Sequence, residues 1–575
     1  MLVTLSAFIV TALLQSVATA QAPVTGRDST RALRLAHRAQ GDFESMRRRL
    51  LPRTIMTSDG GCDAVVGRYC YRQQISTVPP DEAPQVIAAR ERLLAVLDSL
   101  GAMIPGDRWI LGQKLRYLIE AGRPQAADSM AIACAAGTVR STVSWCLALV
   151  GYMAQQSGNY QRADAAYTSA LAEMPESERC KWEDLALFLG RAAGPYRRVD
   201  CEPRELMTAS FWRLVQPLYL TNVNDLRTEF LSRMTRMYIE QDSRTAMSDW
   251  WGSDDRETLF RYGIALWYTQ QAVPREEMRP PEIAGFRRGP SFNFFPDARV
   301  FTSPERLTPA DWELVDATAL NKPRYAPLWA GSFQPLTDHQ VALFRRGDSA
   351  FIVAAFDVND DAALGETRQA GIFAAVVDRG GVLAPFGTRI EKAGLSVVST
   401  LVAPWRPMII SLEVLDPANR AAGRMRFAPN LPLRGPRLSL SDLLLYTPKD
   451  SAPASLTDAV PLAMHALRAQ HNRQIGVFWE TYGVRPQGES FEYALAVEAI
   501  DQGLVHRALV KLHVVEPDRG LSLVWREVPS AAGGIASRGV KVDLSRLKPG
   551  RYRVRLTLTS GTDLPIVAER SIEVL

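Results

Sequence analysis

Apolar residues recur at spacings of three and four from about residue 31 to residue 267, with glycine or proline between the periodic segments. This periodicity predicts amphipathic helices that are joined by short turns. After residue 339 the apolar positions fall into short alternating runs separated by polar turns, which is the pattern of β-strands. The sequence therefore predicts a multidomain protein with an α-helical N-terminal part and antiparallel β-sandwich domains at the C-terminal end.

The clearest helical unit lies between residues 144 and 175. Small residues stand where two helices would touch, aromatic residues would fill the hairpin, and proline would end the second helix. These spacings resemble a tetratricopeptide repeat, and the resemblance implies helical hairpins that stack into a solenoid with a concave groove. The residues that carry the resemblance are Leu147, Gly151, Gly158, Tyr160, Ala163, Tyr167, Ala170 and Pro175, with Leu147 where tryptophan is usual.

Two further segments repeat this plan loosely. Gly122 and Ala127 precede Gly158 and Ala163 by about 36 residues, and a similar turn lies near the N-terminus. We therefore expect a helical solenoid over residues 21–230. The alternative is an irregular helical bundle that contains one such hairpin.

Two tryptophans and four acidic residues are concentrated between Asp249 and Glu257. The surrounding segment, residues 231–268, resembles the GWxTD domain family, although Trp250 and Ser253 depart from the glycine and threonine of that signature. The family occurs in exported bacterial proteins and its biochemical role is uncharacterised. The resemblance therefore implies export from the cytoplasm and implies no catalytic residue. The matching residues are Trp251, Ser253, Asp254, Arg256, Tyr262 and Gly263.

The same segment has a purely structural explanation. Asp254 and Glu257 have the spacing of a capping box at the start of a short helix, and Gly263 can end that helix. Trp250 and Trp251 would then be packing residues. The functional alternative is a carbohydrate-binding or acid/base cleft formed by the carboxylates beside the two indoles.

The remaining chain divides at changes of composition. Residues 269–338 are rich in proline and aromatic residues and predict a connector without regular elements. Residues 339–448 predict one β-sandwich, residues 449–474 a linker, and residues 475–575 a second sandwich. Near its end, Leu547, Gly550 and Tyr552 resemble the tyrosine corner of fibronectin-type sandwiches, in which the tyrosine hydroxyl bonds to the backbone a few residues upstream.

The N-terminus and the cysteines both indicate export. An apolar run over residues 2–14 and small residues at positions 18 and 20 predict a signal peptide over residues 1–20, with a buried core helix as the alternative. Sequential pairing of the six cysteines would link neighbouring helices in an oxidising compartment, either periplasmic or extracellular. Six cysteines allow fifteen connectivities, and buried free thiols are the alternative. The cysteines are Cys62, Cys70, Cys134, Cys146, Cys180 and Cys201.

Composition and motifs narrow the possible functions. A chain of 575 residues with 47% hydrophobic and 22% charged residues folds into several domains. The net charge of +5 comes from arginines mixed with acidic residues, so no nucleic-acid partner is predicted. No later apolar run predicts a transmembrane span. No metal-binding, nucleotide-binding or nucleophile motif is found, and no cofactor is predicted.

These observations favour an exported, non-enzymatic interaction protein of the bacterial cell envelope. A protein or peptide partner would bind in the repeat groove and at the edges or loops of the β domains. One alternative is an envelope hydrolase or glycan-binding protein that uses the segment Trp250–Glu257. Another is a stalk whose β domains only set a distance.

Overall fold

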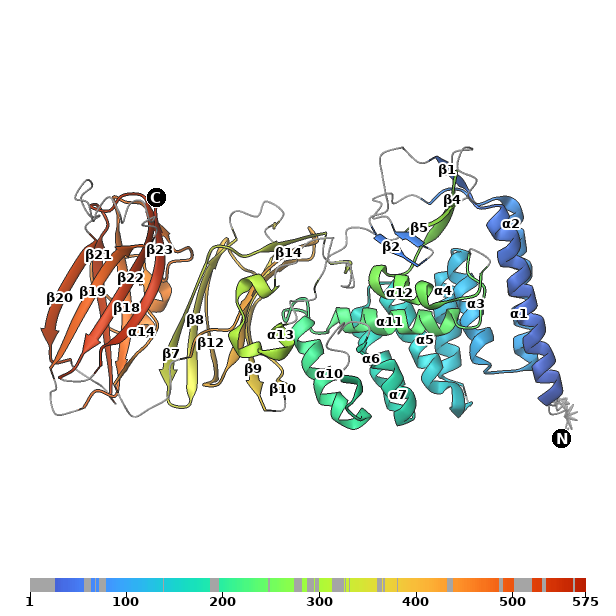
Figure 1. The fold of residues 1–575 in the computed structure, drawn as a ribbon, viewed down its shortest axis with the longest axis horizontal. Coiled ribbons are helices and arrows are strands. Elements are labelled where there is room, and N and C mark those ends of the chain that lie inside the picture. The colour runs from blue at the N-terminus through green and yellow to red at the C-terminus, as the bar shows by residue number, and fades with distance from the viewer. Residues whose placement is uncertain are drawn as a thin grey trace, which may run out of the picture.

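The first half of the chain folds into helices and the second half into β-sheets, and these parts follow one another along the long axis of the molecule (Figure 1). The predicted order of helices before strands is confirmed. The computed structural model describes residues 26–575 except 56–63, 68, 72–78, 138, 187–195, 247–248, 273–281, 287–293, 295–298, 313–324, 326, 330, 359–363, 366–367, 380, 432–437, 486–489, 501–519, 530–533 and 562–563. The predicted signal peptide lies outside these residues.

Helices that are consecutive in the sequence pack side by side in the N-terminal part, and α11 crosses several of them. Only short strands accompany the helices here, namely β1 (Arg53–Ile55), β2 (Ala64–Val66) and β3 (Tyr69–Tyr71). The helices are α1 (Gly26–Arg49), α2 (Pro84–Met103), α3 (Arg108–Glu120), α4 (Pro124–Ala135), α5 (Val143–Gln156), α6 (Tyr160–Ala172), α7 (Glu176–Trp182), α10 (Cys201–Val215), α11 (Asp225–Glu240) and α12 (Ser253–Tyr262).

Two helical hairpins, α3 with α4 and α5 with α6, have matching features 36 residues apart. Gly122 and Gly158 occupy the two turns with φ of 72° and 77°, a conformation that glycine adopts without steric cost. Ala127 and Ala163 are fully buried at equivalent places in the second helices. The spacing that predicted repeated hairpins therefore corresponds to two hairpins of the same design.

Disulfides join elements within the helical part. Cys134 of α4 is bonded to Cys146 of α5, and Cys180 of α7 is bonded to Cys201 of α10. Both bonds are pairs that the sequence predicted. The third predicted pair includes Cys62, which lies outside the described residues.

We expect the Cys134–Cys146 bond to stabilise the helical part appreciably. Closing a loop of 12 residues restricts the unfolded chain, so replacing both cysteines by alanine should lower the free energy of unfolding by about 3 kcal/mol. Urea denaturation of the variant and of the oxidised parent chain measures the difference. The prediction fails if reducing the parent chain leaves its urea midpoint unchanged.

The predicted connector contains regular structure that the sequence pattern did not indicate. Strands β4 (Trp267–Ala272) and β5 (Glu282–Phe286) form an antiparallel pair, and β1 adds to β4 in parallel. A short helix, α13 (Arg299–Thr302), follows. The expectation of a connector without regular elements was therefore wrong for these segments, where Trp267 and Phe286 stack across the two strands. Other aromatic residues of the connector, such as Phe294 and Tyr325, pack in the core shared with the helical part.

The first β domain consists of two sheets over a common apolar core. One sheet has the order β10-β9-β13-β14-β6 with β11 also on β9, and the other has the order β12-β8-β7. Its strands are β6 (Ser332–Pro335), β7 (His339–Arg346), β8 (Ser349–Asp357), β9 (Gln369–Asp378), β10 (Gly381–Val382), β11 (Phe386–Ile390), β12 (Ser396–Pro404), β13 (Met408–Asp416) and β14 (Ala421–Phe427).

Both sheets of this domain are buried on two faces. Phe373 and Ile409 pack with the helical part, while their neighbours Ile372 and Ile410 point into the core between the sheets. Phe344 of the other sheet packs against the second β domain. Burial on both faces explains why β9 and β13 are continuous apolar runs rather than alternating ones.

The second β domain also has two sheets over one core. Strands β15, β16 and β21 pair with β18, and the other sheet has the order β17-β23-β22-β19-β20. Its elements are β15 (Ser439–Leu440), β16 (Leu444–Tyr446), α14 (Leu456–Ala459), β17 (Arg468–Ala469), β18 (Gln474–Tyr482), β19 (Phe491–Ala499), β20 (Leu521–Glu527), β21 (Ile535–Asp543), β22 (Gly550–Thr559) and β23 (Ile566–Val574).

The structure corrects the predicted border between the β domains. Strands β15 and β16 lie within the range assigned to the first domain, yet they pair with β18 of the second. The predicted linker, residues 449–474, contains α14 and β17. The predicted tyrosine-corner bond is present, since the hydroxyl of Tyr552 donates to the carbonyl oxygen of Lys548 at 2.8 Å.

Candidate functional site

The first helices of the two hairpins, α3 and α5, pack against another helix of the same chain. Helix α11 packs against α3, α5 and α6, and most of its side chains are buried. The Gln113 amide donates to the carbonyl oxygen of Ile239 at 2.5 Å, and Arg116 pairs with Glu240 at 2.6 Å. The chain's own helix α11 therefore lies against α3 and α5, the first helices of the two hairpins.

A buried ionic network holds α1, α3 and α11 together. Arg116 contacts Glu44 at 2.9 Å as well as Glu240, and Arg47 pairs with Glu120 at 2.8 Å. Burial raises the pKa of Glu44 despite its arginine neighbours. Burial would also raise the pKa of Glu120. The positive charges of Arg47 and Arg116 have the larger effect and lower the pKa of that carboxyl to about 2. Because each carboxylate is paired with arginine, we assign this network to stability.

The segment Trp250–Glu257 forms the start of α12 rather than a pair of facing carboxylates. The helix is capped by Gly252, whose N–H donates to Asp255 at 2.8 Å, so the predicted cap formed by Asp254 and Glu257 was wrong. Glu257 instead pairs with Arg261 at 3.2 Å. Gly263 ends the helix with φ of 86°, as predicted.

The two tryptophans of this segment differ in exposure. Trp250 is 55% exposed, and the guanidinium carbon of Arg244 lies 4.2 Å from its ring centroid. Trp251 is half-buried. The exposed indole is one part of this segment that a ligand could reach.

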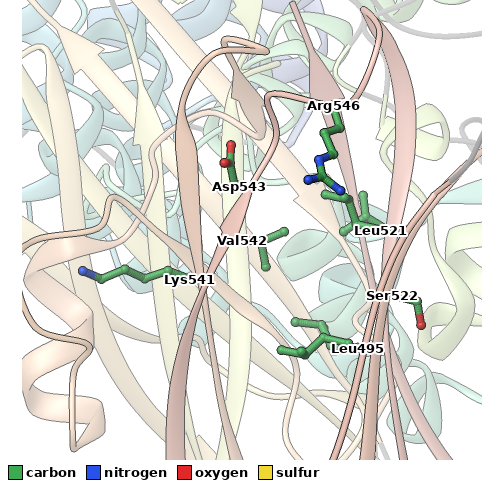
Figure 2. Close-up of a pocket in the computed structure, with 9 residues that line it drawn as sticks. Leu495, Leu521, Ser522, Lys541, Val542, Asp543 and Arg546 are labelled. Atoms are coloured by element: carbon green, nitrogen blue, oxygen red, sulfur yellow. The ribbon is translucent and has the colours of Figure 1, made fainter.

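An open slot lies between the two sheets of the second β domain (Figure 2). Leu495 of β19, Leu521 and Leu523 of β20 and Val542 of β21 line it, and its volume is about 300 Å³. Leu523 is 52% exposed although it lies opposite the buried Leu495. The slot thus exposes apolar side chains that would be core residues in a closed sandwich.

Polar side chains surround one end of the slot. Asp543 and Arg546 lie together at one end in Figure 2, whereas Lys541 extends away from the apolar residues and donates to the carbonyl oxygen of Asp450 at 2.9 Å. The N–H of Ser545 donates to Asp543 and lowers the pKa of that carboxyl. The slot therefore has an apolar interior and one anionic and one cationic group at its rim.

Strand edges flank the slot on both sides. Within the part of the chain that the structure describes, β20 pairs only with β19 and β21 pairs only with β18. Each strand therefore has one edge of backbone N–H and C=O groups that no described strand covers. A segment that pairs with such an edge would place alternate side chains toward the slot.

A second cavity of about 400 Å³ lies where the helical part meets the first β domain. Leu206, Met207 and Phe211 of α10 line it together with Phe301 and Arg379. It borders the contact between α10 and β10, where the N–H of Val382 donates to Ser210 at 2.9 Å. Its position indicates a packing gap between two parts of the chain.

Among the described residues, no three His, Cys, Asp or Glu side chains converge as a metal site would require. In the same residues, no helix combines the length and apolar character needed to cross a bilayer.

The slot was not predicted from the sequence. The segment Leu521–Val528 was recognised as a strand, but its position at the edge of a sheet depends on pairing with distant strands. One signal was available: Leu521, Leu523, Val524 and Val528 place apolar residues on both faces of a short strand. The tyrosine-corner residues lie elsewhere in the same domain and do not line the slot.

Comparisons with known proteins identify no family. No family model matches the chain, and no curated protein matches it. Red sea bream transglutaminase aligns over 42% of this chain and 31% of its own, with 10% identity and a TM-score of 0.14. A Bacteroides uniformis β-glucuronidase aligns over 40% and 26%, with 11% identity and a TM-score of 0.16. TM-scores this low show neither a shared fold nor a shared activity.

Proposed function

We propose that this chain is an exported, non-enzymatic interaction protein of the bacterial cell envelope that binds an extended segment of a partner protein. The observation that carries the proposal is the apolar slot between the edges of β20 and β21 that pair with no other described strand. The two disulfides support an oxidising compartment. The predicted signal peptide and the resemblance to the GWxTD family also support export.

An extended peptide fits this slot better than a small substrate does. A volume of about 300 Å³ is at the lower limit for ligand pockets and would hold one or two apolar side chains. Backbone pairing with β20 or β21 would supply the remaining affinity, and the alternate side chains would supply specificity. The charged side chains of Asp543 and Arg546 at the rim can favour peptides that carry oppositely charged residues next to the apolar ones.

The rest of the molecule would present this site on a rigid support. Buried apolar residues of the two β domains, including Phe344 and Phe478, form one continuous cluster. Arg346 adds an ion pair to Glu480 at 2.6 Å across the same border. The tetratricopeptide-like hairpins would then serve as a packed scaffold, because α11 covers the face that usually binds a partner.

The proposal predicts that a single charge in the slot abolishes peptide binding. We expect a random peptide library screened on the full chain to yield extended peptides with apolar residues at alternate positions. Leu523→Lys should weaken binding of a selected peptide at least about 50-fold, because a buried ammonium is costly to desolvate. Binding is measured by fluorescence anisotropy, and amide hydrogen exchange in β20 and β21 should slow when the peptide is bound.

The matched control is Leu564→Lys, which changes a leucine that is 89% exposed and does not line the slot. It should leave the affinity within twofold. Equal affinities of the Leu523→Lys chain and the parent chain, or protection confined to the helical part, would contradict the proposed site.

A second candidate function rests on the exposed indole of Trp250. Exposed aromatic rings bind sugar rings by stacking, and Arg244 already lies over this ring. A glycan-binding protein of the envelope would lose its affinity for envelope glycans in the variant Trp250→Ala. Glycan array binding that survives this substitution would remove this candidate.

A further inference from the structure

Four arginines form a stripe along the exposed face of α1. A helix advances about 100° per residue, so positions 27, 31, 34 and 38 fall within an arc of about 60°. All four side chains are exposed. The opposite face of α1 packs against the helical core through Ala32, Ala36 and Phe43. The residues of this arginine stripe are Arg27, Arg31, Arg34 and Arg38.

Several other arginines of the helical part pair with a carboxylate. Arg123, Arg162 and Arg179 each pair with a carboxylate, at 2.8, 2.7 and 2.9 Å. Within the described residues, the four guanidinium groups of the stripe have no such partner. Four unpaired positive charges over about 16 Å repel one another, and an anionic partner would relieve that repulsion.

We infer that the arginine stripe binds the anionic phospholipid headgroups of a membrane surface. A straight helix that presents one flat row of guanidinium groups matches a planar array of phosphates, and arginine binds phosphate through two hydrogen bonds. Leu35 is 46% exposed beside the stripe, which suits the boundary between headgroups and acyl chains.

The position of α1 in the molecule is compatible with binding to a membrane surface. It is the outermost helix at the N-terminal end of the molecule, at the opposite end from the second β domain (Figure 1). The apolar run over residues 2–14 ends 12 residues before Gly26, so the chain itself brings α1 close to a bilayer during export. Membrane binding at this end would leave the slot at the other end free for its partner.

The test is co-sedimentation of the full chain with vesicles of phosphatidylcholine alone and with 30% phosphatidylglycerol. Any apolar contribution is common to both vesicle types, so the ratio of the two partition coefficients isolates the headgroup charge. Arginine near an anionic surface contributes roughly fivefold, so Arg31→Gln with Arg34→Gln should lower this ratio about 25-fold. Raising the salt to about 0.5 M should remove the preference.

The charge-matched control is Arg140→Gln with Arg473→Gln, two exposed arginines that lie outside α1. It should change the ratio less than twofold. An unchanged ratio in the Arg31/Arg34 variant would overturn the inference. So would binding to a single-stranded oligonucleotide without binding to the anionic vesicles, which would assign the stripe to nucleic acid.

Discussion

Replacing Glu413 by glutamine should destabilise the contact between the helical part and the first β domain by about 4 kcal/mol. Glu413 and Arg426 are fully buried and 3.0 Å apart, and Glu413 also accepts from the N–H of Leu220 in the helical part at 2.8 Å. Glutamine preserves the shape and can accept the same hydrogen bond. It removes the negative charge that compensates a buried guanidinium, and that loss is the source of the cost.

A second arginine increases the expected effect of Glu413→Gln. Arg424 lies beside Arg426 and donates to the carbonyl oxygen of Pro217 at 2.6 Å. Burial and the charge of Arg426 lower the pKa of Arg424 to about 9, and Glu413 opposes this shift. Without that carboxylate, both guanidinium groups stay buried without a compensating charge.

Urea denaturation followed by tryptophan fluorescence checks this prediction. A loss of about 4 kcal/mol should lower the midpoint of the affected transition by at least about 1 M. Asp378→Asn is the control, because the Asp378–Arg406 pair is exposed and contributes at most about 1 kcal/mol. Equal midpoint shifts for the two variants would show that the buried pair does not hold the domains together.

The sequence predicted the positions of helices and strands better than it predicted which other strands and helices they pack against. Periodicity located α5 and α6 and most strands of both β domains, because helix and strand patterns are local. It could not assign β15 and β16, since pairing with β18 is a long-range choice. The apolar runs of β9 and β13 were recognised as strands, but nothing local shows that one face of each packs on helices.

The slot in the second β domain depends on long-range contacts even more than the strand pairing does. Leu495, Leu521 and Val542 come from three strands, and the slot exists only because two sheet edges lie side by side. The packing of the repeat-like hairpins depends on long-range contacts as well. Helix α11 was predicted as an amphipathic helix, yet its burial by α3, α5 and α6 follows from the tertiary fold.

Replacing Asp225 by asparagine should stabilise the protein above neutral pH and have little effect near pH 4. Asp225 begins α11, is fully buried and accepts a hydrogen bond from the indole N–H of Trp329. Burial raises the pKa of this carboxyl from 3.8 to about 7, since the indole and nearby backbone N–H groups offset the desolvation only partly. Asparagine keeps an acceptor for the indole and has no charge to desolvate.

The sign of the pH dependence follows from the raised pKa of Asp225. The folded protein holds this proton up to about pH 7 and the unfolded chain releases it near pH 3.8, so stability is lost as pH rises between these values. A difference of about three pKa units corresponds to about 4 kcal/mol, fully lost above pH 7. The urea midpoint of Asp225→Asn relative to the parent chain should therefore rise from pH 4 to pH 8.

Asp81→Asn controls for the loss of an aspartate, because Asp81 is exposed. Its midpoint relative to the parent chain should stay nearly constant over the same range of pH. If Asp225→Asn gave an equally flat profile, the carboxyl would be ionised in the folded protein without cost. Leu328 and Trp329 would then pack on the helical part through contacts other than a protonated Asp225, such as the bond from the N–H of Leu328 to the hydroxyl of Tyr160 at 2.7 Å.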